Sequence, residues 1–399
     1  MPAEPARLFT PRFFLMCGFS FTVFLSAFLL FPTAPFRILA LGGSEATAGL
    51  FLGFLTYASA LSAPFTGALA DRLGTRRVLA VCGLALTGFA AAYGWSSDAR
   101  TFLALPLLHG VFWSGLLSAS SAYMSDVIPE GRRAEGLSYW GLSTVAAVAV
   151  APSLGFWLFH QGWGVLCAAM AGLNALMGLI ALGLPPESAS ATRGGAARGV
   201  AGLIEWRIVA FALSLFLCSF GYGGLTSFSA LYAEAGGVTP RSVYLNTLAL
   251  TILGTRPVLG RLADRLGPRN VFIPALLSMG LGLLVLAVSG RLPALVASAV
   301  LFGVGLGQAH PAFSAYVLQH VDARRRGAAF GAILAAFDTG IGTGSILIGL
   351  LVSRFGFRAA FGCAAALAAL AVPYFLWAER RFLAGARPPA VGPGPNRHP

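Results

Sequence analysis

One short stretch occurs twice in this sequence, as GALADRLGTRRV at residues 67–78 and as GRLADRLGPRNV at residues 260–271. The two copies are identical at nine of twelve positions and lie 193 residues apart. Without a gap, the same offset pairs residues 110, 119, 121–123, 132 and 133 with residues 303, 312, 314–316, 325 and 326. Because one register aligns several motifs, we predict that the chain contains a duplicated unit.

The composition excludes a soluble protein. Of the 399 residues, 57% are hydrophobic and 10% are charged, and the mean hydropathy is +0.78. A soluble globular domain has about 25% charged residues, so this chain lacks the polar surface that water requires. The five cysteines all fall in apolar stretches without metal-ligand spacing, and they predict neither disulfides nor a metal site. The sequence therefore predicts an all-α integral membrane protein.

A membrane-spanning helix needs about 20 mostly apolar residues, and the sequence contains twelve such runs. They cover residues 13–36, 47–70, 78–96, 101–126, 136–159, 163–184, 207–232, 243–263, 271–289, 293–320, 327–351 and 357–377. Together with the repeat, they predict twelve transmembrane helices arranged as two pseudo-symmetric six-helix bundles. Duplicated halves of this kind are an arrangement that secondary transporters use to place a site between two rocking units.

The positive charges predict the orientation of the chain. All 27 basic residues are Arg, and with a cytoplasmic N-terminus 20 of them fall in cytoplasmic segments and six in outer segments. This bias follows the positive-inside rule, so we expect a multi-pass protein of a bacterial inner membrane with both termini in the cytoplasm. The Arg residues do not gather on one soluble segment, so we expect contact with the lipid bilayer and no nucleic-acid partner.

Two segments that do not span the membrane divide the chain. Residues 185–206 are rich in Pro, Gly, Ser and Arg, and we interpret them as a flexible cytoplasmic linker. Residues 383–399 form a Pro- and Gly-rich tail that cannot bury enough apolar surface to fold, so we expect a disordered cytoplasmic tail. The predicted domains are therefore an N-terminal six-helix bundle at residues 1–184 and a C-terminal six-helix bundle at residues 207–382.

The repeated stretch resembles the signature loop of the major facilitator superfamily, which lies between the second and third spans. The resemblance covers nearly the whole chain and implies a transporter that works by alternating access. It also implies a gating motif, in which Asp71 and Arg77 form a charge cluster with Asp126 and latch the outward-facing state. The matching positions are Gly67, Asp71, Arg72, Gly74, Arg76, Arg77 and Asp126, and in the second copy Gly260, Asp264, Arg265, Gly267 and Arg269. The alternative is that these Arg residues only set the topology.

Further stretches at residues 109–110, 126–142 and 151–155 look like bacterial drug and solute efflux members of the family. The chain departs from that pattern at two positions. Pro106 stands where many proton-driven efflux members have a buried Arg, and Ala151 replaces the first glycine of a motif associated with exporters. The first departure shifts the expected proton coupling towards Asp338 and Arg256 in the C-terminal half, and the second weakens the indication of export.

Two charged residues lie well inside predicted spans, where an ionisable group costs about 3 kcal/mol or more and is a functional candidate by default. Arg256 lies about 10 Å and Asp338 about 16 Å from the cytoplasmic ends of their spans, at a rise of 1.5 Å per residue. An Arg side chain can bridge the difference, so we predict that the two pair and take part in proton coupling. In the alternative, Arg256 extends to lipid headgroups and Asp338 caps a Gly-rich break.

Polar and aromatic side chains in the spans are candidates for lining a solute cavity. These are His109, Trp113, Tyr139, Tyr222, Gln308 and His310. A single histidine in a span is more often a hydrogen bonder between helices, and most aromatic residues face lipid or neighbouring helices. Such a cavity, with Asp338 neutralised by Arg256, favours amphipathic solutes over highly charged ones.

The leading hypothesis is a secondary-active transporter that moves a small organic solute by alternating access, as proton-coupled export. The alternatives are a solute importer, an uncoupled facilitator, or a membrane sensor without transport. We expect no enzyme activity, because no catalytic constellation occurs, and no cofactor, because a nucleotide loop of the GxxxxGK[ST] type needs the Lys that this sequence lacks. Two halves in one chain make a monomer sufficient.

Overall fold

The computed structural model describes residues 8–185, 206–321 and 326–383, and these residues are helical, with no strand among them. The first group of helices is α1 (Pro11–Leu30), α2 (Ala34–Ala40), α3 (Glu45–Leu73), α4 (Thr75–Trp95), α5 (Ala99–Val127), α6 (Arg133–Gln161) and α7 (Trp163–Gly183). The second group is α8 (Trp206–Ala235), α9 (Val243–Leu266), α10 (Pro268–Val288), α11 (Leu292–Gln319) and α12 (Arg326–Ala378). A short turn, η1 (Glu130–Arg132), precedes α6, and η5 (Glu379–Leu383) follows α12.

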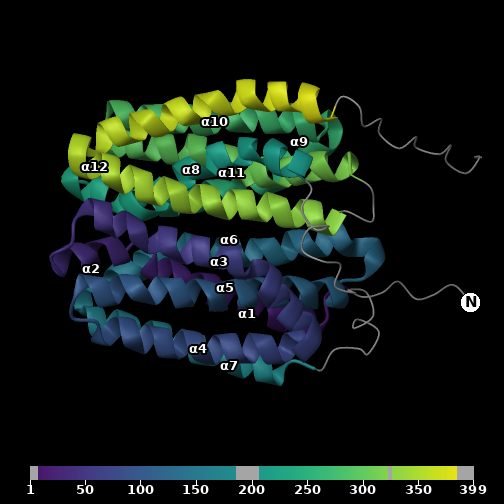
Figure 1. Cartoon of the computed structure of the whole chain (residues 1–399), viewed down its shortest axis with the longest axis horizontal. Helices are drawn as coiled ribbons and strands as arrows, with labels where there is room; N and C mark the ends of the chain where they lie inside the picture. Colours follow the sequence, from purple (N-terminus) through teal and green to yellow (C-terminus); the bar gives the residue numbers. More distant parts are fainter. Residues whose placement is uncertain (1–7, 186–205, 322–325, 384–399) are drawn as a thin grey trace, which may run out of the picture.

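The long helices run side by side, and the two groups form two bundles (Figure 1). Of the predicted linker, the structure describes residues 185 and 206, and of the predicted tail it describes residue 383. The rest of both segments lies outside the described residues.

Ten helical stretches of the described chain are long and apolar enough to cross a membrane, against the twelve runs predicted. The difference has two causes. Helix α9 contains Asn246, Thr247 and Arg256, and such polar residues lower its hydropathy. Helix α12 extends over 53 residues and counts as one stretch. Its backbone is nevertheless non-helical at Gly356, with φ 78° and ψ 172°, and this residue lies between the last two predicted runs.

The two bundles repeat the same internal packing. A Cβ at Gly110 of α5 would meet the carbonyl oxygen of Leu55 in α3, and a Cβ at Gly303 of α11 would meet the carbonyl oxygen of Leu248 in α9. Both members of the second pair lie 193 residues after their counterparts. Glycine allows helix backbones to approach closely, so both bundles use it at the same crossing.

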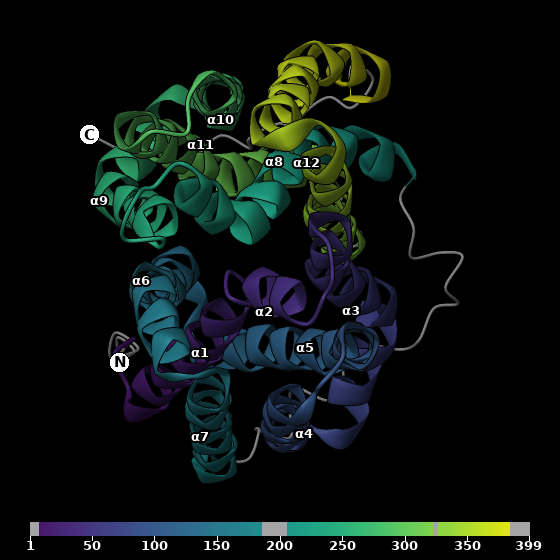
Figure 2. The same ribbon diagram turned by 90° about the vertical axis from the view of Figure 1, so that its left-hand side faces the viewer.

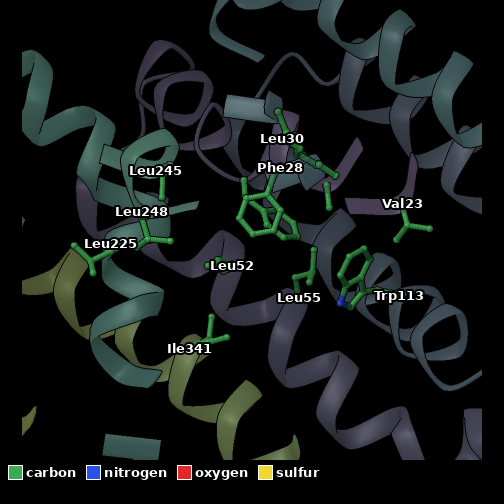
Figure 3. Packing of buried hydrophobic residues seen from close by; sticks show 14 of the residues in the cluster. Val23, Phe28, Leu30, Leu52, Leu55, Trp113, Leu225, Leu245, Leu248 and Ile341 are labelled. Atoms are coloured by element: carbon green, nitrogen blue, oxygen red, sulfur yellow. The ribbon is translucent and has the colours of Figure 1, made fainter. Parts of the chain in front are cut away.

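The bundles meet along two pairs of helices, α3 with α12 and α6 with α9 (Figure 2). Buried apolar side chains from both bundles surround this junction (Figure 3). They include Phe28 of α1, Leu52 and Leu55 of α3, Leu248 of α9 and Ile341 of α12. The core therefore continues from one bundle to the other.

Candidate functional site

A seal of small residues joins the two bundles near the N-terminal end of α3. A Cβ at Gly49 would overlap the carbonyl oxygen of Ser345, and a Cβ at Gly349 would lie 2.6 Å from the carbonyl oxygen of Glu45. The Ser345 hydroxyl donates a hydrogen bond of 2.9 Å to the carbonyl oxygen of Gly49. The backbones of α3 and α12 are thus in direct contact, with no room for larger side chains.

Polar and aromatic contacts extend this seal. The Tyr57 hydroxyl lies 2.7 Å from Thr343 Oγ1, the Ser153 and Ser242 hydroxyls lie 3.0 Å apart, and the Arg241 guanidinium lies over the ring of Phe36 at 5.1 Å. Each of these contacts joins one bundle to the other. The seal extends from mid-helix to the end of the molecule that lies away from both chain termini (Figure 1).

Arg256 of α9 crosses towards the other bundle. It lies ten residues before the end of α9, which is about 15 Å along the helix axis. A Cβ at Gly141 of α6 would lie 3.2 Å from its Nη2 atom. Its Nη1 atom is buried and has no hydrogen-bond partner. The guanidinium therefore lies against α6 rather than extending along α9 to a headgroup region.

Asp338 of α12 is partly buried, and within the described chain it makes no hydrogen bond or ion pair. The predicted pairing of Arg256 with Asp338 is therefore absent from this conformation. The physical reason is the direction of the arginine, which lies against Gly141 in the opposite bundle.

A cavity of about 200 Å³ lies inside the first bundle beside Gly141. Its walls are formed by α1, α5 and α6, from Ser20, Val23, Phe24, Leu116, Leu117, Ser120, Trp140, Gly141 and Thr144. Trp140 Nε1 donates a hydrogen bond of 2.7 Å to the Ser20 hydroxyl, and the buried Ser120 hydroxyl has no partner among the described residues. The walls are mainly apolar, with a few hydroxyl groups, which is the usual character of a small-molecule pocket.

Trp113 is the cavity candidate nearest to this pocket, because its ring contacts Phe24 with the centroids 5.7 Å apart. Tyr139 is 45% exposed and packs on Phe9 near the start of α6, and it does not line the pocket. His109 is buried between α4 and α5, where it bonds the Tyr93 hydroxyl at 3.1 Å and stacks on Phe89. His109 thus follows the alternative interpretation, a histidine that joins helices.

The remaining candidates lie in the second bundle. Tyr222 of α8 stacks between Phe302 and Phe337. His310 packs edge-on against the Phe337 ring at 5.2 Å. Gln308 is buried on α11, two residues before His310. Tyr222 and His310 both contact Phe337, the residue before Asp338 in the sequence, and neither lines the pocket at Gly141.

The two signature loops adopt the same backbone shape. Gly74 and Gly267 lie between consecutive helices with φ of 90° and 81°, values that favour glycine. Asp71, Arg72 and Arg77 are exposed, and no ion pair joins Asp71 to Arg77 in the described chain. Asp126 lies exposed near the end of α5, and in the second copy Arg265 is exposed. Gly67 is half-buried. Gly260 and Asp264 are part of helix α9, but the structure describes only their backbone.

Arg76 and Arg269, which are equivalent positions of the repeat, both bind the chain near the end of the last long helix of their bundle. Arg76 donates a hydrogen bond to the carbonyl oxygen of Leu182. Arg269 forms a two-pronged ion pair with Glu379, at 2.7 and 2.9 Å, and the Tyr316 hydroxyl also donates to this carboxylate. Each of these arginines therefore holds the start of one helix to the end of another, in addition to contributing positive charge.

Replacing Glu379 with Gln is expected to lower the stability of the second bundle by about 1 kcal/mol, because the pair is two-pronged but partly exposed. The thermal unfolding midpoint of the protein in nanodiscs measures this change. Glu135→Gln is the matched control, since the Arg132–Glu135 pair is exposed on both sides and should contribute little. Equal midpoints for wild type and Glu379→Gln would contradict this role.

None of the residues predicted from the sequence belongs to the seal. Its signal is present as small residues four positions apart, Gly49 with Gly53 on α3 and Ser345 with Gly349 on α12. This spacing places both residues on one helix face and allows close helix contact in membranes.

Among the described residues there is no group of three His, Cys, Asp or Glu side chains that could hold a metal ion.

Comparison with known proteins decides the family. The sequence profile of the Major Facilitator Superfamily matches residues 16–255 and 211–394. The chain belongs to this superfamily. It is 26% identical over 343 residues to the uncharacterized MFS-type transporter YhhS of Escherichia coli (strain K12), covering 83% of each chain. The efflux subclass implied by the resemblance goes beyond this match and remains a prediction.

Solved transporters share the fold of this member of the superfamily. A bacterial homolog of the human lysosomal transporter Spinster, in an inward-facing and occupied conformation, superposes with a TM-score of 0.77 at 16% identity, over 95% of this chain and 98% of that chain. The nucleoside transporter NupG superposes with a TM-score of 0.75 at 15% identity, over 92% and 99%. The protein is therefore a multi-pass membrane transporter of solutes, and its family and fold are not those of enzymes.

Proposed function

We propose that the protein exports a small organic solute in exchange for protons, by alternating access between its two bundles. One observation carries the proposal. The bundles are in backbone contact at the Gly49–Ser345 seal, while the charged groups Arg256 and Asp338 lie deeper along α9 and α12. A seal at one end with ionisable groups behind it is what alternating access requires of one end state.

The distribution of Arg residues supports an orientation for this state. If both termini are cytoplasmic, the seal lies on the outer side and the protein is closed to the outside. We propose twelve spans, with α9 as one of them and α12 divided at Gly356 into two. The two bundles then correspond to residues 1–184 and 207–382, and one chain in the bacterial inner membrane forms a complete transporter.

The signature loops are proposed to act in the other state of the cycle, in which the cytoplasmic end is closed. In the conformation described, Asp71 and Arg77 are exposed at the end away from the seal. Closing the cytoplasmic end would bring this end of α3 towards the other bundle, where Asp71, Arg77 and Asp126 would form the charge cluster. The second loop, with Gly260, Asp264 and Arg265, takes the equivalent place in the other bundle.

Asp338 is the proposed proton carrier. Among the described helices it is the one acidic residue far from a helix end, and it has no ion-pair partner there. A carboxylate held in apolar surroundings is costly, so a change of exposure between two states can drive uptake and release of a proton. The solute is an organic molecule, in keeping with the nucleoside transporter among the proteins of the same fold.

Solute-triggered proton flux in proteoliposomes tests this proposal. A pH-sensitive dye inside the vesicles reports protons while a panel of amphipathic drugs and small metabolites is added. We expect one solute class to trigger proton movement opposite to its own. Proton movement in the same direction would indicate an importer, and solute movement without protons would indicate a facilitator, so either result would overturn proton-coupled export.

A further inference from the structure

Arg256 has a permanent charge, and no counter-ion for it lies among the residues that the structure describes. A guanidinium stays protonated in proteins, and its burial without a partner is unfavourable. Within the described chain Arg256 has no ion pair, and its Nη1 atom is buried without a hydrogen bond. No acidic residue lies within a turn of it on α9, since the sequence around it reads LTILGTRPVLG at residues 250–260.

The guanidinium lies against Gly141, one of the residues that line the pocket in the first bundle, and is not itself part of the lining. Gly141 lines that pocket, and a Cβ on Gly141 would lie 3.2 Å from Nη2 and 3.3 Å from Nη1 of Arg256. Because Gly141 has no side chain, the charge from the second bundle reaches the α6 wall of a pocket in the first. The solute site would then include groups from both bundles.

The pocket itself is suited to an apolar body. Val23, Phe24, Leu116 and Leu117 are among the residues that line it, and its volume of about 200 Å³ is small beside the roughly 300 Å³ at which drug-sized sites begin. One aromatic ring or a fused pair fits this size better than a long chain or a large polar molecule. The Ser120 hydroxyl, buried without a partner, is one hydrogen-bonding group for such a ligand.

We propose that the transported solute is a small amphipathic anion, whose oxyanion group binds Arg256 and whose apolar body occupies the pocket beside Gly141. This inference rests on the proposed transport function and names the substrate class for it. It replaces the expectation that Asp338 neutralises Arg256, because the anion that balances Arg256 is the solute. Arginine is suited to this task because its planar fork binds a carboxylate through two hydrogen bonds.

Matched acid and amide probes test the charge requirement. The full-length protein in nanodiscs is titrated with benzoate, 2-naphthoate and the uncharged primary amide of each, with the thermal midpoint as the readout. We expect the wild type to bind each acid about tenfold to a hundredfold more tightly than its amide, the range for a hydrogen bond to a charged group. Equal affinity for acid and amide in the wild type would overturn the proposal without any variant.

Variants then assign the preference to particular residues. Arg256→Gln should remove the preference for acids, and Arg256→Lys should keep part of it because the charge remains. Leu117→Phe should reduce the affinity for 2-naphthoate more than for benzoate, because it fills the pocket. If Arg256→Gln folds and still binds the acids as the wild type does, Arg256 is not the anion site.

Transport assays separate this inference from the proposed function. If Arg256→Gln transports uncharged solutes as well as the wild type does, the anion site is overturned. The protein would still be a transporter. Binding of the acids through Arg256, without movement of any solute in proteoliposomes, would support the anion site and contradict transport.

Discussion

Replacing Gly49 with Val is expected to lower transport by about fivefold to a hundredfold. The added side chain would overlap the carbonyl oxygen of Ser345, and this neighbour is backbone, which cannot turn aside. Overpacking of this kind costs about 1–3 kcal/mol, and each 1.4 kcal/mol changes the balance between two states tenfold. The cost falls on the sealed state alone, so the variant should accumulate in the state that is open at this end.

Chemical labelling distinguishes this arrest from misfolding. In a background without native cysteines, Thr343→Cys lies at the Tyr57 contact in the sealed state. A membrane-impermeant maleimide added from outside should label it faster when Gly49→Val is also present. Gly88→Val is the matched control, because Gly88 is exposed with nothing within 4 Å of a Cβ, and it should leave both labelling and transport unchanged. Normal transport by Gly49→Val would show that the seal does not open and close during the cycle.

Replacing Asp338 with Asn is expected to abolish proton flux and uphill transport while leaving solute binding intact. Asn has almost the same shape and hydrogen-bonding capacity, but it cannot exchange a proton. Because Asp338 has no ion-pair partner in the described chain, the substitution leaves no buried charge uncompensated. Downhill movement of solute should continue, since the bundles and their seal are unaltered.

Parallel measurements in proteoliposomes check this outcome. Proton flux, uphill uptake and downhill exchange are compared for wild type, Asp338→Asn and Asp338→Glu. The Glu variant should retain part of the proton flux, because it keeps a titratable group at the site. Proton coupling of wild-type strength in Asp338→Asn would exclude Asp338 from the mechanism and require another carrier.

Much of the helix arrangement could be predicted, because a bilayer imposes length and hydropathy on each crossing segment. The predicted run 47–70 falls within α3, Glu45–Leu73, and the run 163–184 ends one residue beyond α7. The repeat predicted a duplicated unit, and the equivalent residues Arg76 and Arg269 both bind the chain near the end of the last long helix of their bundle. Hydropathy alone does not give the number of crossings, because α9 contains Arg256 and α12 continues past Gly356.

Contacts between side chains were harder to predict. A rise of 1.5 Å per residue gives the depth of Arg256 and Asp338 but not the helix face on which each lies. Their similar depths suggested a pair, whereas Arg256 lies against Gly141 of the other bundle. His109 is a similar case, since the sequence shows a polar group deep in a span but not that Tyr93 is its partner.

Distances between spin labels at both ends of the bundles test alternating access most directly. One pair, at Ser44 and Arg354, reports the sealed end, and a second pair, at Leu73 and Leu334, reports the end near the termini; all four positions are exposed. In nanodiscs, changing pH and adding solute should lengthen the first distance while shortening the second. Distances that stay constant, or that lengthen together, under conditions where transport is measured would contradict alternating access between the two bundles.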